Sequence, residues 1–182
     1  MNCTKFAFLL LLFVAAATIA ASAQTQVFVP GNASGYFGRP LDLVVPFVPA
    51  ITVAGPGTIT VTYLSGTVTG YNMEAGPNGV PWDQGTSQLP LQEAKGGAGG
   101  KVNNLCALIG VFVPQARVAH QGFSAIDGTK NSARVGIMPG WLFFIGEGKT
   151  FDVKEAGTLF LGINDQLVSD NGGGFNVEVT GP

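Results

Sequence analysis

The sequence predicts an all-β protein, an antiparallel β-sandwich of short strands joined by tight turns. Its 27 glycines and 11 prolines in 182 residues disfavour helices and favour turns. About eight runs of four to nine residues are rich in β-branched and aromatic residues and are bounded by Gly, Pro, Asn or Asp, as strands are. No helical period separates these runs, and this pattern is typical of a sandwich.

The first 23 residues are typical of a secretory signal peptide. Lys5 precedes an apolar run from Phe6 to about Ala17, and the small residues Ala21-Ser22-Ala23 follow. The apolar run is short for a bilayer span, and neither a stop-transfer charge cluster nor a second apolar stretch comes after it. We expect cleavage after Ala23 and a secreted mature chain, periplasmic or extracellular, without a membrane anchor.

The remaining residues, 24–182, are enough for one domain with a real core. The expected strands lie, in order, at 25–30, 41–48, 58–64, 105–113, 141–146, 150–154, 157–165 and 175–181. The last run, FNVEVTG, alternates most clearly, with Phe175, Val177 and Val179 on one face. Between residues 70 and 104 the strand pattern lapses into Gly-Pro, Asn-Gly and GGAGG, which predicts a long surface loop and a second place to look for a site.

The charge balance and the absence of known motifs disfavour several functions. Nine Lys and Arg stand against 11 Asp and Glu, with no basic cluster, so nucleic acid and anionic membranes are poor partners. His120 has no Gly-x-Ser-x-Gly elbow and no zinc-type spacing to join, which favours a protein that is not an enzyme. Cys106, the only cysteine outside the signal peptide, lies in an apolar run and is expected to be a buried small hydrophobe.

The stretch GINDQLVSDNGGGFNVEVTG, residues 162–181, crowds polar oxygen donors between two strands. Asp165 and Asp170 would repel each other at close range unless a cation lay between them, and with Asn171 they offer the hard oxygen ligands that calcium prefers. The glycines at 172–174 are expected to turn the chain back sharply. Asx turns and a glycine-rich hairpin use the same residues, so a plain chain reversal remains the alternative.

The same stretch resembles the carboxyl-terminal hairpin of calcium-dependent galactophilic lectins of the PA-I (LecA) type. That family shows an Asn-Asp at a strand end, a short loop, a pair of Asn or Asp residues, a small Gly/Ser-rich turn and Phe-x-Val. The match extends more weakly through NNLCALIGVF and the GPNG loop at 76–79, so it covers about 54–181. The resemblance implies a jelly-roll, galactose-binding-domain-like sandwich, of a kind that many exported bacterial proteins carry.

The resemblance also implies a calcium site that bridges to two neighbouring sugar hydroxyls. Asp165, Asp170 and Asn171 match the side-chain ligands, and the main-chain carbonyl of Val168 falls near the family's loop carbonyl. A further carbonyl is expected from Thr69, Gly70 or Tyr71. An aromatic side chain usually covers the C–H face of a sugar, a role open to Trp82 or Tyr71.

The sequence departs from the family in the sugar-contacting loop. Asp83 and Gln84 stand there without the family's histidine, and the connection from Asp165 to Asp170 is two residues shorter. Galactose specificity therefore does not transfer, although a galactose-like or other vicinal-diol sugar is the expected partner. We expect a secreted calcium-dependent carbohydrate-binding domain; the alternative is a calcium-rigidified structural or adhesive module without sugar binding. A homo-oligomer stays open.

Overall fold

The computed structural model describes residues 22–33, 47–81, 104–116, 142–165 and 168–182. Residues 1–21 of the signal peptide expected at 1–23, most of the strand expected at 41–48, and His120 lie outside the described residues. So do Trp82, Asp83 and Gln84. Within the described ranges the predicted antiparallel β-sandwich is confirmed, because every paired strand is antiparallel. These residues form no helix long and apolar enough to cross a membrane.

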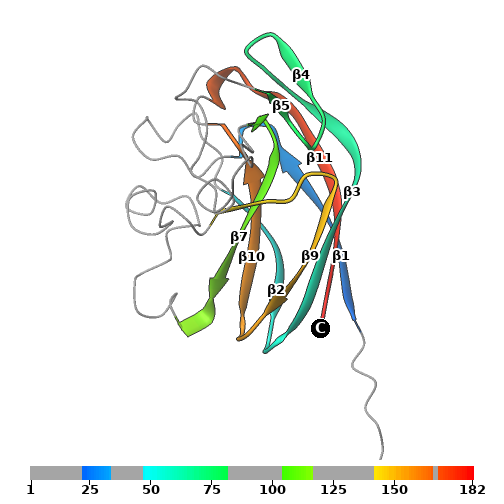
Figure 1. Cartoon of the computed structure of the whole chain (residues 1–182), viewed down its shortest axis with the longest axis vertical. Helices are drawn as coiled ribbons and strands as arrows, with labels where there is room; N and C mark the ends of the chain where they lie inside the picture. The colour runs from blue at the N-terminus through cyan, green and yellow to red at the C-terminus, as the bar shows by residue number, and fades with distance from the viewer. Residues whose placement is uncertain (1–21, 34–46, 82–103, 117–141, 166–167) are drawn as a thin grey trace, which may run out of the picture.

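The larger sheet has five strands (Figure 1). They run in the order β1-β11-β3-β4, and β9 pairs with the other half of β3. The strands are β1 (Ala23–Pro30), β11 (Gly172–Gly181), β3 (Gly57–Gly70), β4 (Met73–Ala75) and β9 (Gly148–Val153). The amino-terminal strand therefore pairs along its length with the carboxyl-terminal one, from Ala23 with Gly181 to Pro30 with Gly174.

The second sheet has four strands in the order β2-β10-β7-β8. They are β2 (Val48–Val53), β10 (Gly157–Ile163), β7 (Leu108–Pro114) and β8 (Phe143–Phe144). A separate small ribbon joins β5 (Val80–Pro81) to β6 (Asn104–Leu105). A short 3-10 turn, η4 (Val168–Asp170), precedes β11.

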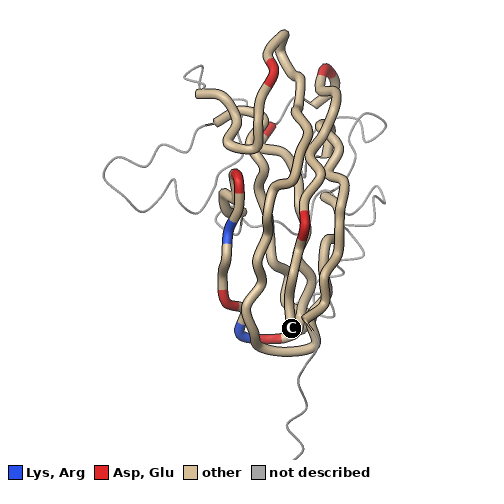
Figure 2. Tube along the Cα trace, turned by 90° about the vertical axis from the view of Figure 1, so that its right-hand side faces the viewer, with Lys and Arg blue, Asp and Glu red and all other residues tan. Residues whose placement is uncertain are grey.

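The two sheets bury one apolar core between them. On β11 the predicted alternation is confirmed, with Phe175, Val177 and Val179 fully buried and Asn176 exposed. The outer faces carry few charges (Figure 2). Inward-facing residues from both sheets include Val29, Ile59, Val61, Ile51, Val53, Leu108, Leu159, Leu161 and Ile163.

Several strands differ from those expected. β3 runs on to Gly70, past a register shift in which Ser65 pairs with Asn176 and Tyr63 with Val177, so that Leu64 is an extra residue. The region expected to be loop from residue 70 contains β4, β5 and β6. The expected strand at 105–113 begins only at Leu108, because Cys106 has a φ of 62°.

Candidate functional site

The chain crosses from one sheet to the other between β10 and β11. β10 ends at Ile163 in the four-stranded sheet, and β11 begins at Gly172 in the five-stranded sheet. The expectation of a hairpin here was therefore wrong: the two strands are not neighbours, and the connection is an arch over one end of the sandwich (Figure 1). The glycines at 172–174 are strand residues opposite Thr69, Val68 and Thr67, not the expected turn, although Gly173 has a φ of 70°.

The buried side of the arch is built on Asn164 and Asp165. Asn164 is fully buried; its amide donates to Ala107 O at 2.9 Å and its Nδ2 to Asn104 O at 3.0 Å. Its own carbonyl accepts the Cys106 amide at 3.1 Å. These bonds tie the end of β10 to the β6–β7 connection, so the next residue, Asp165, is held in place at only 3% exposure.

The buried thiol of Cys106 contacts Asp165 and lies near Asp170. Its Sγ donates to Asp165 Oδ2 across 3.8 Å. Burial, first of all, then the charge of Asp165 with its hydrogen bond to the thiol, and then the charge of Asp170, together raise the pKa of the Cys106 thiol to about 12. The expectation of a buried cysteine is confirmed, and the thiol stays protonated at neutral pH while both carboxylates act on it.

The β3–β4 hairpin closes the site from the opposite side. The Tyr71 amide donates to Asp170 Oδ2 at 3.0 Å, which anchors the otherwise exposed Asp170 to the hairpin tip. Gly70 lies against the Asn171 carboxamide: a Cβ there would collide with Asn171 Oδ1 and lie 3.1 Å from Cys106 Sγ. Only glycine lets the hairpin come this close.

Asn171 places its side-chain oxygen beside Gly70 and Cys106. Its Nδ2 donates to Gly31 O at 2.9 Å, which fixes the orientation of the carboxamide. Its Oδ1 is buried and has no hydrogen-bond partner among the described residues. A buried acceptor without a partner costs about 1–3 kcal/mol, so this atom is suited to a ligand.

The remaining expected ligands are main-chain carbonyls. Val168 is buried, and its carbonyl accepts the Asn171 amide at 3.2 Å, which closes the 3-10 turn but leaves the oxygen's second lone pair. Thr69 pairs with Gly172, and Gly70 pairs with Met73 across the hairpin. The structure thus brings Asp165, Asp170 and Asn171 to one end of the sandwich with the expected hairpin segment beside them.

The arrangement fits a hard cation better than a soft one. Carboxylate, carboxamide and carbonyl oxygens are the ligands that calcium takes. In the part of the chain that the structure describes, no group of three or more His, Cys, Asp or Glu residues could hold a metal ion by itself. The fit therefore depends on the Asn171 oxygen and backbone carbonyls acting beside the two carboxylates.

Sequence reasoning missed the residues that position this set. Gly31 orients Asn171, Asn164 fixes the end of β10, and Cys106 lies under Asp165. The role of Asn164 could have been predicted, because a side-chain amide directly after an apolar strand is well suited to bond the backbone at that strand's end. The role of Gly31 could not, since its partner Asn171 is 140 residues away in the sequence.

The chain has a distant structural similarity to one lectin domain and no match to a known family. No family model matches the chain. No curated protein matches it either. Among solved structures, it is similar to the N-terminal domain of EclA, described as a PllA-like lectin, with 16% sequence identity and a TM-score of 0.45. The match covers 87% of this chain and 96% of that one, and at this TM-score it carries no argument about function.

Proposed function

We propose that this protein is a secreted, non-enzymatic domain that binds carbohydrate through a calcium ion held between β10, η4 and the β3–β4 hairpin. The observation that carries the proposal is the convergence of Asp165, Asp170 and Asn171, with Asn171 Oδ1 buried and without a hydrogen-bond partner among the described residues. Asp165 and Asp170 supply two negative charges at one place. A divalent ion would relieve their repulsion and the cost of burying Asp165.

The chain's own groups account for most of the expected ligand shell. Asp165, Asp170 and Asn171 contribute side-chain oxygens, and Val168 and one residue of 69–71 contribute carbonyls. Five protein oxygens leave about two positions of the usual 6 to 8 open. When bound, the ion offers those positions to a vicinal diol, whose two hydroxyl oxygens replace two waters. Asp170 is exposed, so its carboxylate is placed to accept a hydrogen bond from the same hydroxyls.

One observation also favours a structural role. The proposed ligands come from the end of one sheet, the start of the other and a hairpin, so an ion bound there would cross-link both layers of the sandwich. A calcium-rigidified structural or adhesive module is therefore the second candidate. It shares the metal site but needs no sugar.

A glycan array run in calcium and again in chelator separates the candidates. The proposed function predicts binding to sugars with vicinal hydroxyls that disappears in chelator, and a calcium affinity that rises when the sugar is present, because the two ligands are thermodynamically linked. Stabilisation by calcium without any glycan binding supports the structural module. Glycan binding that persists in chelator would contradict the role of the ion.

A further inference from the structure

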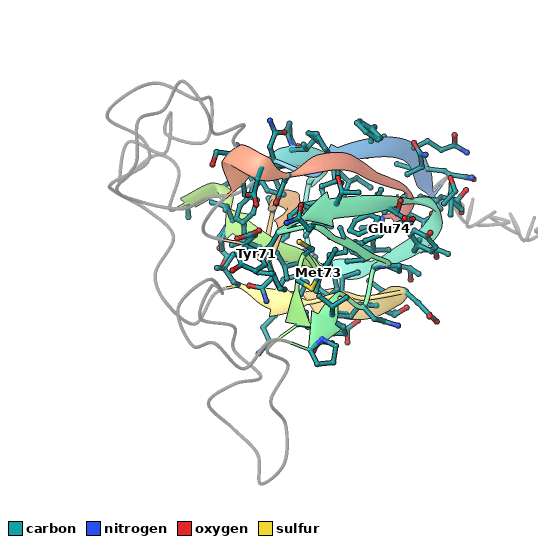
Figure 3. The ribbon with its side chains drawn as sticks, turned by 90° about the horizontal axis from the view of Figure 1, so that it is seen from above. Tyr71, Met73 and Glu74 are labelled. Atoms are coloured by element: carbon teal, nitrogen blue, oxygen red, sulfur yellow. The ribbon has the colours of Figure 1, made fainter. Side chains whose placement is uncertain are left out.

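Tyr71 lies at the tip of the β3–β4 hairpin, directly beside the proposed ligands. Its amide donates to Asp170 Oδ2, and the preceding Gly70 packs on the Asn171 carboxamide. Its side chain is 58% exposed, the largest exposure among the large hydrophobic side chains that the structure describes. Figure 3 shows Tyr71 on the side of the hairpin nearer the start of β11, with Met73 and Glu74 farther along it.

The backbone at Tyr71 is unfavourable for a tyrosine. Tyr71 and Asn72 have φ values of 48° and 59° and link the paired residues Gly70 and Met73. Two consecutive positive φ values define a type I′ hairpin, whose positions favour Asn, Asp and Gly. A bulky residue with positive φ is an outlier. Turn chemistry does not explain this tyrosine, and local violations of this kind cluster at binding sites.

The strand that neighbours the end of β3 carries no side chains at its start. β11 begins with Gly172 opposite Thr69 and Gly173 opposite Val68. Tyr71 is thus an exposed aromatic residue next to the candidate cation site, and an exposed ring is suited to pack against a flat apolar ligand.

We propose that Tyr71 carries the C–H face of the sugar and so selects pyranosides that combine a vicinal diol with an apolar ring face. This role rests on the proposed function. Aromatic rings pack against apolar faces through dispersion and burial. The hydroxyls on the edge of the sugar remain directed toward the carboxylates. The Tyr71 side chain acts on the sugar ring, whereas its main chain serves the cation site through the amide bond to Asp170 and as one of the candidate carbonyls at 69–71, and substitution of the side chain preserves these backbone groups.

The test uses Tyr71→Ala and Tyr71→Phe in the full chain, with methyl β-galactopyranoside and methyl α-fucopyranoside as probes. We expect Tyr71→Ala to lower sugar affinity about tenfold at unchanged calcium affinity. We expect Tyr71→Phe to keep the affinity of the wild type. In wild type the C–H protons of the bound sugar should show upfield ring-current shifts by NMR, which vanish in Tyr71→Ala.

Phe28→Ala is the matched control. Phe28 on β1 is an aromatic residue of similar exposure, 54%, whose ring lies over Gly174 rather than at the hairpin tip. This variant should leave sugar affinity unchanged. If Tyr71→Ala binds sugar as wild type does, the proposed contact between Tyr71 and the sugar is wrong while the proposed function stands. If wild type binds neither probe and no glycan on the array, the proposed function fails and the role of Tyr71 fails with it.

A second variant separates function from structure. Tyr71→Asn supplies a residue that the turn favours, so its Tm in chelator should rise by about 2 to 4 °C while its sugar affinity falls. A tyrosine kept only for packing predicts the opposite, a lower Tm. That result would overturn the proposal.

Discussion

Replacing Asp165 by Asn tests the calcium site with the least structural disturbance. The variant keeps the size of the side chain and an oxygen acceptor for the Cys106 thiol, but removes one charge from a residue that is 3% exposed. A ligand at 100 times its Kd stabilises the native state by about 2.7 kcal/mol. For a domain of this size that amounts to a Tm increase of about 5 to 11 °C. Wild type should show this increase on going from chelator to calcium, and Asp165→Asn should show most of it lost.

The Tm of Asp165→Asn in chelator shows whether Asp165 acts through the ion or through the fold. Without calcium, Asp165→Asn should be as stable as wild type or slightly more so, because Asp165 and Asp170 both act on the Cys106 thiol and so lie near enough to repel each other. Differential scanning calorimetry in the two buffers measures both arms. An equal loss of Tm in calcium and in chelator would show that Asp165 stabilises the fold without an ion.

Three further predictions address the surroundings of the site. Gly70→Ala should lower calcium affinity more than tenfold, measured by isothermal titration calorimetry, because its Cβ would collide with Asn171 Oδ1. In the control Gly76→Ala the added Cβ would meet nothing within 4 Å, so calcium affinity should not change. Equal calcium affinities of the two variants would show that the close contact between Gly70 and Asn171 is unimportant. The Cys106 pKa is raised from 9.0 to about 12 by folding, so its contribution to stability is complete below pH 9 and is lost as pH rises from 9 toward 12, by about 1.4 kcal/mol per pH unit. In chelator, the urea midpoint of wild type should therefore fall more steeply above pH 9 than that of Cys106→Ala, and parallel curves would contradict the burial of the thiol. Amino-terminal sequencing of exported protein should begin at Gln24, and a start at Met1 would exclude cleavage after Ala23.

The sequence predicted the strands that alternate or run unbroken through apolar residues, and it missed those that depend on distant partners. Pro49 argues against a strand, yet it lies in β2, which is an edge strand of its sheet, where a missing amide is tolerated. Leu159 of β10 pairs with Ile51 and Phe160 with Pro49, so Ala50 is an extra residue on β2 at this register shift. β4 is three residues long and has no pattern of its own, so only its pairing with the end of β3 defines it.

The candidate site was predictable where its residues are close in sequence. Asp165, Asp170 and Asn171 are joined by a short segment, which limits how far apart they can lie. The contribution of the hairpin tip was expected only from the family resemblance, because no local pattern links Tyr71 to Asp170, 99 residues away. The hairpin expected between β10 and β11 was wrong for the same reason: strand neighbours in sequence need not share a sheet.

We propose that one divalent cation is held by oxygens from both sheets at the β10–β11 arch. A crystal structure grown in calcium, with an anomalous difference map, would locate this ion. We predict a single strong peak about 2.3 to 2.6 Å from carboxylate oxygens of Asp165 and Asp170 and from Asn171 Oδ1. A map without a peak there, with a water or a protein donor bonded to Asn171 Oδ1 instead, would show that these residues hold no cation.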